Sequence, residues 1–423
     1  MTLSPVRRWL IFAALSLTYF VVSAGAFSSL GVVLPAMVGE MHWSWKQAGL
    51  GYTLLGLACG LASYLPAILI RRFGVRGAIL AGMIVMVGGF GAMAMAHSIW
   101  LYWAATVLIG IAFALVSTVP GSHVLTDLFK RRATALGAYF TIGASGGVAG
   151  PIYYLGIHAA AHGWRPYWIG FVVISLLVGL FALVVAPGRR EDAADAPVPL
   201  AADVSEKAGP EKAGPEPTGG WTVRGALATP QFYLIVAGYS VYLLVNSTTH
   251  GFAVQHLIER GVSQTDAASM LSIEALVGAA VGLFGGMLGE KVSAKTLMVV
   301  SLAAATVGSF ALAEARGWPL MTLYILGVGI GFGLSFVAAA LLLFEYFGKR
   351  ANLELFSLMC LLSTIAAFGP FVGGWMRDAT GSFWGVLMGL GGVTGAVLVA
   401  SLFLQPPVLR QAPQMAQPRE AAL

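Results

Sequence analysis

The chain has 423 residues, of which 58% are hydrophobic and only 10% are charged, and its formal net charge is +6 at pH 7. Soluble domains contain roughly one quarter charged residues, so this composition excludes an ordinary soluble domain and predicts a protein that crosses a membrane repeatedly. We attribute the positive charge to membrane topology and expect no nucleic-acid partner. The two cysteines, Cys59 and Cys360, lie in apolar runs and predict neither a disulfide framework nor a metal site.

Apolar runs bounded by charged or turn residues follow one another along the chain, and each can cross a ~30 Å hydrocarbon core as a helix. They are separated into two sets by a polar, low-complexity segment that repeats Glu-Lys-Ala-Gly-Pro. The predicted spans are 10–34, 47–70, 77–96, 100–121, 135–158 and 164–186, then 231–257, 266–289, 296–314, 318–341, 355–376 and 382–405.

This order predicts an all-α membrane protein with twelve transmembrane helices in two six-helix halves. The predicted parts are a first half (1–187), a cytoplasmic linker (188–228), a second half (229–406) and a cytoplasmic tail (407–423). Most of the 24 Lys and Arg residues fall in loops on one side of these spans, and none lies near the membrane centre. Positive loops face the cytoplasm, so we expect a multi-pass protein of the inner or plasma membrane with both termini cytoplasmic.

An internal repeat supports the division into halves. Similar segments recur 218 to 220 residues apart and in the same order. A duplicated six-helix unit around a central cavity is a plan that transporters use, with binding near mid-depth. The matching segments are 129–133 with 347–351, Gly150-Pro151 with Gly369-Pro370, Tyr19 with Tyr239, and 28–31 with 248–251.

Three segments resemble motifs of the major facilitator superfamily. Residues 71–76 resemble its basic loop motif, 286–295 resemble the second copy of that motif, and 143–151 resemble the Gly-rich motif of the fifth helix. Ala67 and Arg71 depart from the first copy, where Gly and Asp are usual. The resemblance covers the whole chain and implies the major facilitator fold and alternating access.

The first half is most similar to the monocarboxylate and oxalate/formate transporter group, through residues 31–35, 42–45, 72–77 and 129–133. This resemblance implies a small organic acid as substrate and symport with protons. The second half departs from the group. Carriers of this kind have an Asp and a substrate-binding Arg on the eighth helix, where this chain has Gly278 and Gly282. The Lys that some members carry on the first helix is absent as well, so the group's carboxylate anchor does not carry over.

Glu274 and His250 are the candidate proton-coupling residues. Glu274 interrupts an apolar span, and acids within a membrane usually face a cavity and serve protons, ions or substrate. His250 lies in a polar interruption of span 7 and is predicted at a similar depth, where an imidazolium–carboxylate pair would respond to pH. The alternatives are a protonated Glu bonded to a neighbouring helix and a structural His.

Further polar side chains within apolar spans are candidates for contact with the substrate, although tyrosine also packs structurally in membranes. His250 belongs to this set because it is the strongest donor available to an anion. The candidate substrate-binding residues are His250, Tyr19, Tyr239, Tyr139, Ser28 and Asn246.

Charged residues at the cytoplasmic ends of the spans are candidates for a gate. Ion pairs between the halves would hold an outward-open state there, and the alternative is that these residues only set the topology. The candidate gating residues are Arg72, Asp127, Arg131, Lys291, Glu345 and Arg350.

The sequence therefore predicts a secondary active transporter, and not an enzyme, that moves a small monocarboxylate-like anion with protons. A proton-driven exporter of drug-like or siderophore-like compounds is the alternative, favoured by the missing membrane Lys or Arg. A non-transporting sensor or lipid scaffold is a third class, which the lack of an added soluble domain disfavours. We expect no cofactor, a monomer, and a small organic acid, protons and the lipid bilayer as partners.

Overall fold

A computed structural model of the chain describes residues 4–117, 120–121, 124–125, 128–129, 132–161, 163–186, 221–288 and 291–407, and every regular element in these ranges is a helix. The helices of the first half are α1 (Pro5–Gly25), α2 (Phe27–Met41), α3 (Trp45–Ala62), α4 (Leu65–Ala94), α5 (Ile99–Val116), α7 (Arg132–Ala161) and α8 (Arg165–Val185).

The second half follows the linker. Its helices are α9 (Val223–Leu227), α10 (Pro230–Glu259), α11 (Gln264–Leu288), α12 (Ala294–Glu314), α13 (Trp318–Ser363), the 3-10 helix η2 (Thr364–Phe368), α14 (Gly369–Thr380) and α15 (Trp384–Leu402). The short α9 lies at the end of the predicted linker, and linker residues before 221 and tail residues after 407 lie outside the described residues.

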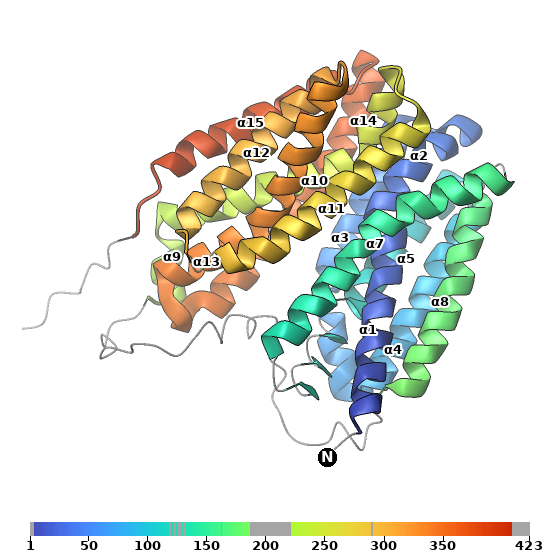
Figure 1. Cartoon of the computed structure of the whole chain (residues 1–423), viewed down its shortest axis with the longest axis horizontal. Coiled ribbons are helices and arrows are strands. Elements are labelled where there is room, and N and C mark those ends of the chain that lie inside the picture. Colours follow the sequence, from blue (N-terminus) through green and yellow to red (C-terminus); the bar gives the residue numbers. More distant parts are fainter. Residues whose placement is uncertain are drawn as a thin grey trace, which may run out of the picture.

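Ten helical stretches of the described residues are long and apolar enough to cross a membrane. The two other predicted spans, 47–70 and 135–158, correspond to α3 with the start of α4 and to α7. The predicted all-helical membrane fold is thus confirmed. Figure 1 shows the two halves side by side, with blue-to-green helices in one and yellow-to-red helices in the other.

Two of the predicted turns between spans lie within α4 and α13, each of which consists of two helices joined at a non-helical glycine. Gly74 in α4 has φ 75° and ψ 174°, and Gly348 in α13 has φ 70° and ψ 178°. This backbone region is essentially restricted to glycine. Both glycines follow a phenylalanine and stand two residues before an arginine, so the same local sequence makes the same turn at two places.

Two of the predicted spans remain single apolar stretches, Val6–Met41 and Glu354–Thr380, but each contains a break in its helix that the sequence analysis did not predict. Span 10–34 divides at Ala26, where ψ is −91°, and the Ser29 hydroxyl donates a hydrogen bond to the Ala24 carbonyl beside the break. Span 355–376 divides into the end of α13, η2 and α14, which begins at Gly369-Pro370. Hydroxyls and neighbouring helices commonly satisfy the backbone groups that such breaks release within a membrane.

The buried apolar side chains form three clusters, and one of them joins the two halves. The largest cluster contains residues of both halves, among them Val32, Tyr52, Phe252 and Leu271. Each of the other clusters belongs to one half, and they include Ile11 and Leu136 in the first half and Phe347 in the second. We call the end of the bundle nearest the N-terminus the cytoplasmic end, following the predicted orientation, and the opposite end the outer end. The ribbons converge toward the outer end and diverge toward the cytoplasmic end (Figure 1).

Candidate functional site

A single face of α10 presents several of the predicted site residues. Tyr239, Asn246 and His250 are spaced seven and four residues apart, and such positions lie on one face of an α-helix. The ring of His250 is fixed by its own helix, because its Nδ1 lies 2.9 Å from the Asn246 carbonyl oxygen. A carbonyl only accepts, so Nδ1 carries the hydrogen and Nε2 points away from α10.

Glu274 of α11 lies against this histidine. Its Oε2 is 3.6 Å from His250 Nε2, and the Glu274 side chain is fully buried. Neither carboxyl oxygen has a hydrogen-bond partner among the described residues. Glu274 is ten residues from Gln264, the first residue of α11, which places it ~15 Å below the outer end at ~1.5 Å per residue. The two predicted coupling residues therefore meet near the middle of the bundle.

Other polar groups around the pair also lack partners among the described residues. Asn246 Nδ2 and the Tyr324 hydroxyl are buried and unpaired there. Buried polar atoms in native proteins are normally satisfied by protein, water or ligand. This polar cluster (Asn246, His250, Glu274 and Tyr324) can thus accommodate water, a proton or a polar ligand group.

Sequence reasoning missed three tyrosines at this site. Tyr52, Tyr242 and Tyr324 come from α3, α10 and α13, and all are close enough to Glu274 for its charge to act on them. Nothing in their spacing separates them from the tyrosines that pack structurally in apolar spans. Only the tertiary structure brings them to Glu274.

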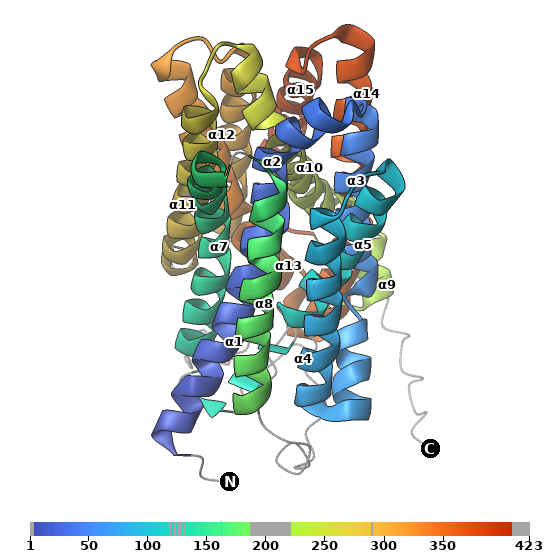
Figure 2. The ribbon, with the colours of Figure 1, turned by 90° about the vertical axis from the view of Figure 1, so that its right-hand side faces the viewer.

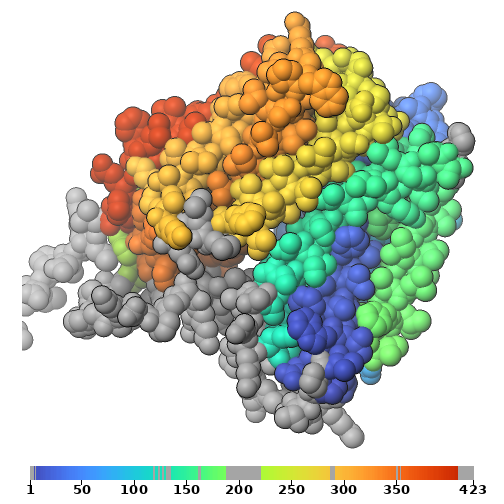
Figure 3. All heavy atoms as spheres, viewed as in Figure 1, coloured from blue at the N-terminus to red at the C-terminus, as the bar shows by residue number. Residues whose placement is uncertain are grey.

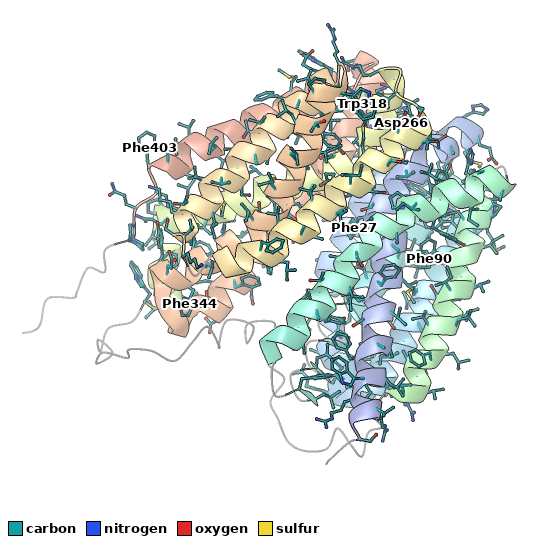
Figure 4. The ribbon with its side chains drawn as sticks, in the orientation of Figure 1. Phe27, Phe90, Asp266, Trp318, Phe344 and Phe403 are labelled. Carbon is teal, nitrogen blue, oxygen red and sulfur yellow. The ribbon has the colours of Figure 1, made fainter. Side chains whose placement is uncertain are left out.

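Aromatic rings extend from this region in both halves. In the first half, Tyr19 and Phe27 each make an edge contact with Phe113, at centroid distances of 6.0 and 5.4 Å. In the second half, Tyr239 contacts Tyr242 and Phe336, at 5.8 and 6.2 Å. The repeat partners Tyr19 and Tyr239 thus take corresponding places in the two halves. Figure 4 shows Phe27 near the junction of the halves.

The repeated motif 28–31 packs directly against its counterpart 248–251. A Cβ on Gly31 would overlap the His250 carbonyl oxygen, so glycine is what allows α2 and α10 to approach here. Ser28 is buried, and its hydroxyl lies beside Gly147 of α7. The two copies of the motif therefore meet at the contact between the halves, immediately next to the His250–Glu274 pair.

Tyr139 packs against Tyr19, with ring centroids 5.2 Å apart. It is fully buried in the apolar cluster of the first half, and its hydroxyl donates to the Ser117 carbonyl. Because its polar atom already has an internal partner, the structure gives it the environment of a packing residue.

The glycines that replace the carboxylate anchor face α13. A Cβ on Gly278 would meet the Phe332 ring, and a Cβ on Gly282 would lie 3.5 Å from the Gly333 carbonyl oxygen. These positions are occupied by helix packing and leave no room for an arginine. Every described Lys and Arg lies near a helix end or at one of the two glycine kinks.

The described members of the predicted gating set lie at the cytoplasmic end. Asp127 and Arg131 are outside the described residues, and only the backbone of Arg350 is described. Arg72, Lys291 and Glu345 are exposed. Because the halves diverge at this end, this arrangement does not test whether these residues pair when the halves close there, and the gate stays a prediction. Among the described residues, no group of His, Cys, Asp and Glu is placed to hold a metal ion.

The fold and the site define a polytopic helical membrane protein with a buried acid between two duplicated halves. The family model of the Major Facilitator Superfamily matches residues 15–351 and 235–422. The chain belongs to this superfamily of transporters.

Solved structures of the same fold are similar over nearly the whole chain. The nucleoside transporter NupG superposes with a TM-score of 0.70 at 14% identity, covering 94% of this chain and 98% of NupG. A bacterial homologue of the human lysosomal transporter Spinster, in an inward-facing and unoccupied conformation, gives a TM-score of 0.67 at 18% identity and 95% coverage of both chains. At these identities the likeness concerns the fold alone.

Curated relatives match only in part. Multidrug resistance protein MdtH of Klebsiella pneumoniae (strain 342) is 30% identical over 91 residues, which is 22% of this chain and 23% of MdtH. MdtH of Salmonella typhi is 26% identical over 163 residues, which is 36% of this chain and 39% of that protein. The matched segments thus span less than half of either relative.

Proposed function

We propose that this protein is a proton-coupled exporter of lipophilic organic cations, working by alternating access, with Glu274 as the group that proton and substrate occupy in turn. The observation that carries the proposal is the fully buried Glu274 against His250, surrounded by unpaired polar atoms. An acid at this depth is costly unless it is protonated or paired, and intramembrane acids usually serve protons, ions or substrate.

Charge favours a cation over an anion as the substrate. The one acid of the polar cluster has no Lys or Arg beside it, since every described Lys and Arg lies near a helix end or a glycine kink. Sequence reasoning left His250 as the strongest donor for a carboxylate, but Nδ1 is bonded to the Asn246 carbonyl and Nε2 faces Glu274. An anion would therefore meet a carboxyl group and a histidine whose Nδ1 is already bonded and whose Nε2 faces that carboxyl group.

The aromatic rings near the site suit the same substrate class. Tyr19, Phe27 and Phe113 lie on the first half, and Tyr239, Tyr242 and Phe336 lie on the second. The face of an aromatic ring attracts a cation, and the attraction grows where water is excluded. A flat lipophilic cation could contact rings of both halves while its charge approaches Glu274.

Competition between proton and cation for the Glu274 carboxyl couples the proton flux to the substrate flux. A protonated Glu274 has no charge to offer a cation, and a cation bound to ionised Glu274 disfavours protonation. One site then exchanges proton for substrate as the halves alternate, and the proton gradient drives the substrate outward. The partial matches to MdtH, a protein named for multidrug resistance, support this direction.

A second candidate function is the carriage of small organic acids with protons. The observation in its favour is the first-half resemblance to the monocarboxylate and oxalate/formate group at residues 31–35, 42–45 and 72–77. In that case protonated His250 would be the main donor for the carboxylate. Under either function we propose the inner or plasma membrane as the location.

Transport by purified protein in proteoliposomes separates the two candidates. We expect the flux of tetraphenylphosphonium or ethidium, measured against an imposed proton gradient, to rise at least about tenfold over the flux without a gradient, since one proton exchanged across one pH unit corresponds to a tenfold ratio. Labelled lactate is expected to show no such response. Gradient-driven lactate transport without transport of either cation would favour the carriage of organic acids over the export of cations.

A further inference from the structure

An acid of α14 binds the beginning of α3 across the two halves. Asp378 Oδ1 accepts a hydrogen bond from the Trp45 backbone N–H at 3.0 Å, and Oδ2 accepts one from the Lys46 N–H at 2.8 Å. Trp45 and Lys46 are the first two residues of α3, and Asp378 lies near the end of α14. The carboxylate therefore caps the N-terminus of a helix in the opposite half.

The local sequence leaves these two amides open for such a partner. The first N–H groups of an α-helix have no acceptor within the helix. The hydroxyl of the N-cap residue Ser44 accepts from Gln47 N–H, and the Ser44 backbone N–H donates to Gln47 Oε1. The Trp45 and Lys46 N–H groups are left for other acceptors. The positive end of the helix dipole also favours a carboxylate at this place.

The same seam between α3 and α14 is closed at several further points. The Thr53 hydroxyl oxygen accepts from Phe371 N–H at 3.2 Å. A Cβ on Gly49 would overlap the Pro370 carbonyl oxygen, and one on Gly374 would overlap the Trp45 carbonyl oxygen. The backbones of α3 and α14 are thus in direct contact along this seam. Figure 2 shows α14 next to the outer end of α3.

Aromatic rings close the outer end beside the carboxylate. Trp45 of the first half makes edge contacts with Phe252 and Phe383 of the second half, at 6.0 and 5.3 Å. Phe252 and Phe383 stack on each other at 4.8 Å. The outer end is therefore shut where Asp378 binds, whereas the halves diverge at the cytoplasmic end (Figure 1).

The duplicated seam between α7 and α11 lacks this carboxylate. The repeat offset that aligns Gly150-Pro151 with Gly369-Pro370 places Ala159 where the second half has Asp378. The cross-half hydrogen bond found at that seam is a long one, 3.4 Å from Gln264 Nε2 to the Tyr154 hydroxyl. Figure 3 shows α7 and α11 meeting along the face in view. The α3–α14 seam thus has the Asp378 contact, and Lys46 Nζ 5.8 Å from the Phe371 ring centroid, where the described residues of the α7–α11 seam have the Gln264–Tyr154 bond.

We propose that Asp378 is the latch of the outer gate: it holds the outer end closed by capping α3, and it must leave the Trp45 and Lys46 amides before the protein opens outward. The role concerns the alternation of the halves and is independent of substrate class and of Glu274. The α7–α11 seam separates by breaking uncharged contacts. The Asp378 latch therefore acts at the α3–α14 seam alone.

Spin-label distances across the outer end test the latch. Labels at Met95 and Thr265, in a chain with Cys59 and Cys360 replaced by Ala, report the separation of the halves by double electron–electron resonance. We expect Asp378→Asn and Asp378→Ala to raise the ratio of open to closed outer ends by about two- to fivefold, the range expected for a charge at a helix N-terminus. The matched control Tyr154→Phe removes the bond at the other seam and should leave the ratio within experimental error.

Salt gives a second, independent readout. Asp378 is exposed, so its interaction with the helix is screened. High salt should open the outer end of the wild type toward the distribution of Asp378→Asn and should change that variant little. Equal distributions for the wild type, Asp378→Asn and Asp378→Ala would overturn the latch, as would an equal shift in Tyr154→Phe. A failure of the proposed cation export would leave these distance distributions unaffected.

Discussion

Transport driven by a proton gradient is expected to disappear in Glu274→Gln, falling at least about tenfold to the level of passive exchange, because the amide cannot take up and release a proton. Gln has nearly the volume of Glu and remains able to hydrogen-bond, so the buried pair with His250 keeps its packing. Exchange of the cation across equal proton concentrations should fall as well, because the neutral amide, like protonated Glu274, has no charge to offer a cation. Flux into proteoliposomes with and without the gradient measures both quantities.

Asp266→Asn is the matched control for this variant. Asp266 lies on the same helix, α11, but is exposed near its outer end, where Figure 4 labels it. Its neutralisation should leave gradient-driven flux unchanged within about twofold, since surface changes have small effects. Full gradient-driven flux in Glu274→Gln would show that the proton travels by another route.

A single methyl group at Gly31 is expected to block the transport cycle. Its Cβ would overlap the His250 carbonyl oxygen, and backbone, unlike a flexible side chain, cannot move aside without separating α2 from α10. Overpacking of this kind costs about 1–3 kcal/mol, and the cost falls on the arrangement in which the outer end is closed. We therefore expect Gly31→Ala to lower the initial transport rate by about tenfold, as 1.4 kcal/mol implies.

Gly39→Ala provides the comparison on the same helix. Gly39 also lies in α2, but a Cβ there meets no atom within 4 Å. Both substitutions raise helix propensity by a similar amount, so a difference between them isolates the contact at Gly31. Equal transport rates for the two variants would mean that the close approach of α2 and α10 is not needed during the cycle.

The fold was predictable because its determinants are local. Length and apolarity of the runs predicted the spans, and most helix bounds lie within a few residues of the prediction, as for 231–257 and α10 (Pro230–Glu259). The breaks at Ala26 and at Thr364–Phe368 were not predicted. Apolar composition continues through them, and the hydroxyl and inter-helix contacts that stabilise a broken helix come from tertiary structure.

The site was predictable where a residue is chemically out of place. Glu274 and His250 stood out because ionisable groups are costly in an apolar run, and the sequence predicted similar depths for them on sequential helices. Their 3.6 Å contact agrees with this expectation, whereas their roles in coupling stay predictions. Tyr324 gave no such signal, because its unpaired hydroxyl is visible only once α11 and α13 are placed together.

Asp378 was missed for a related reason. Its sequence position, in the turn region after an apolar span, is where any acid lies harmlessly in solvent. Its partners are backbone amides of α3, which carry no residue-specific signature in a sequence. The prediction of gates from charges therefore identified only the cytoplasmic residues, whose opposite charges suggest pairs.

Proton release on substrate binding tests the central claim most directly. Purified protein in weakly buffered detergent solution, observed with a pH-sensitive dye, is mixed with tetraphenylphosphonium, a cation that itself carries no exchangeable proton. Competition at Glu274 predicts release of about one proton or less per protein molecule, because one carboxyl changes state, and no release from Glu274→Gln. Binding of the cation without proton release, or equal release from the wild type and Glu274→Gln, would contradict the account.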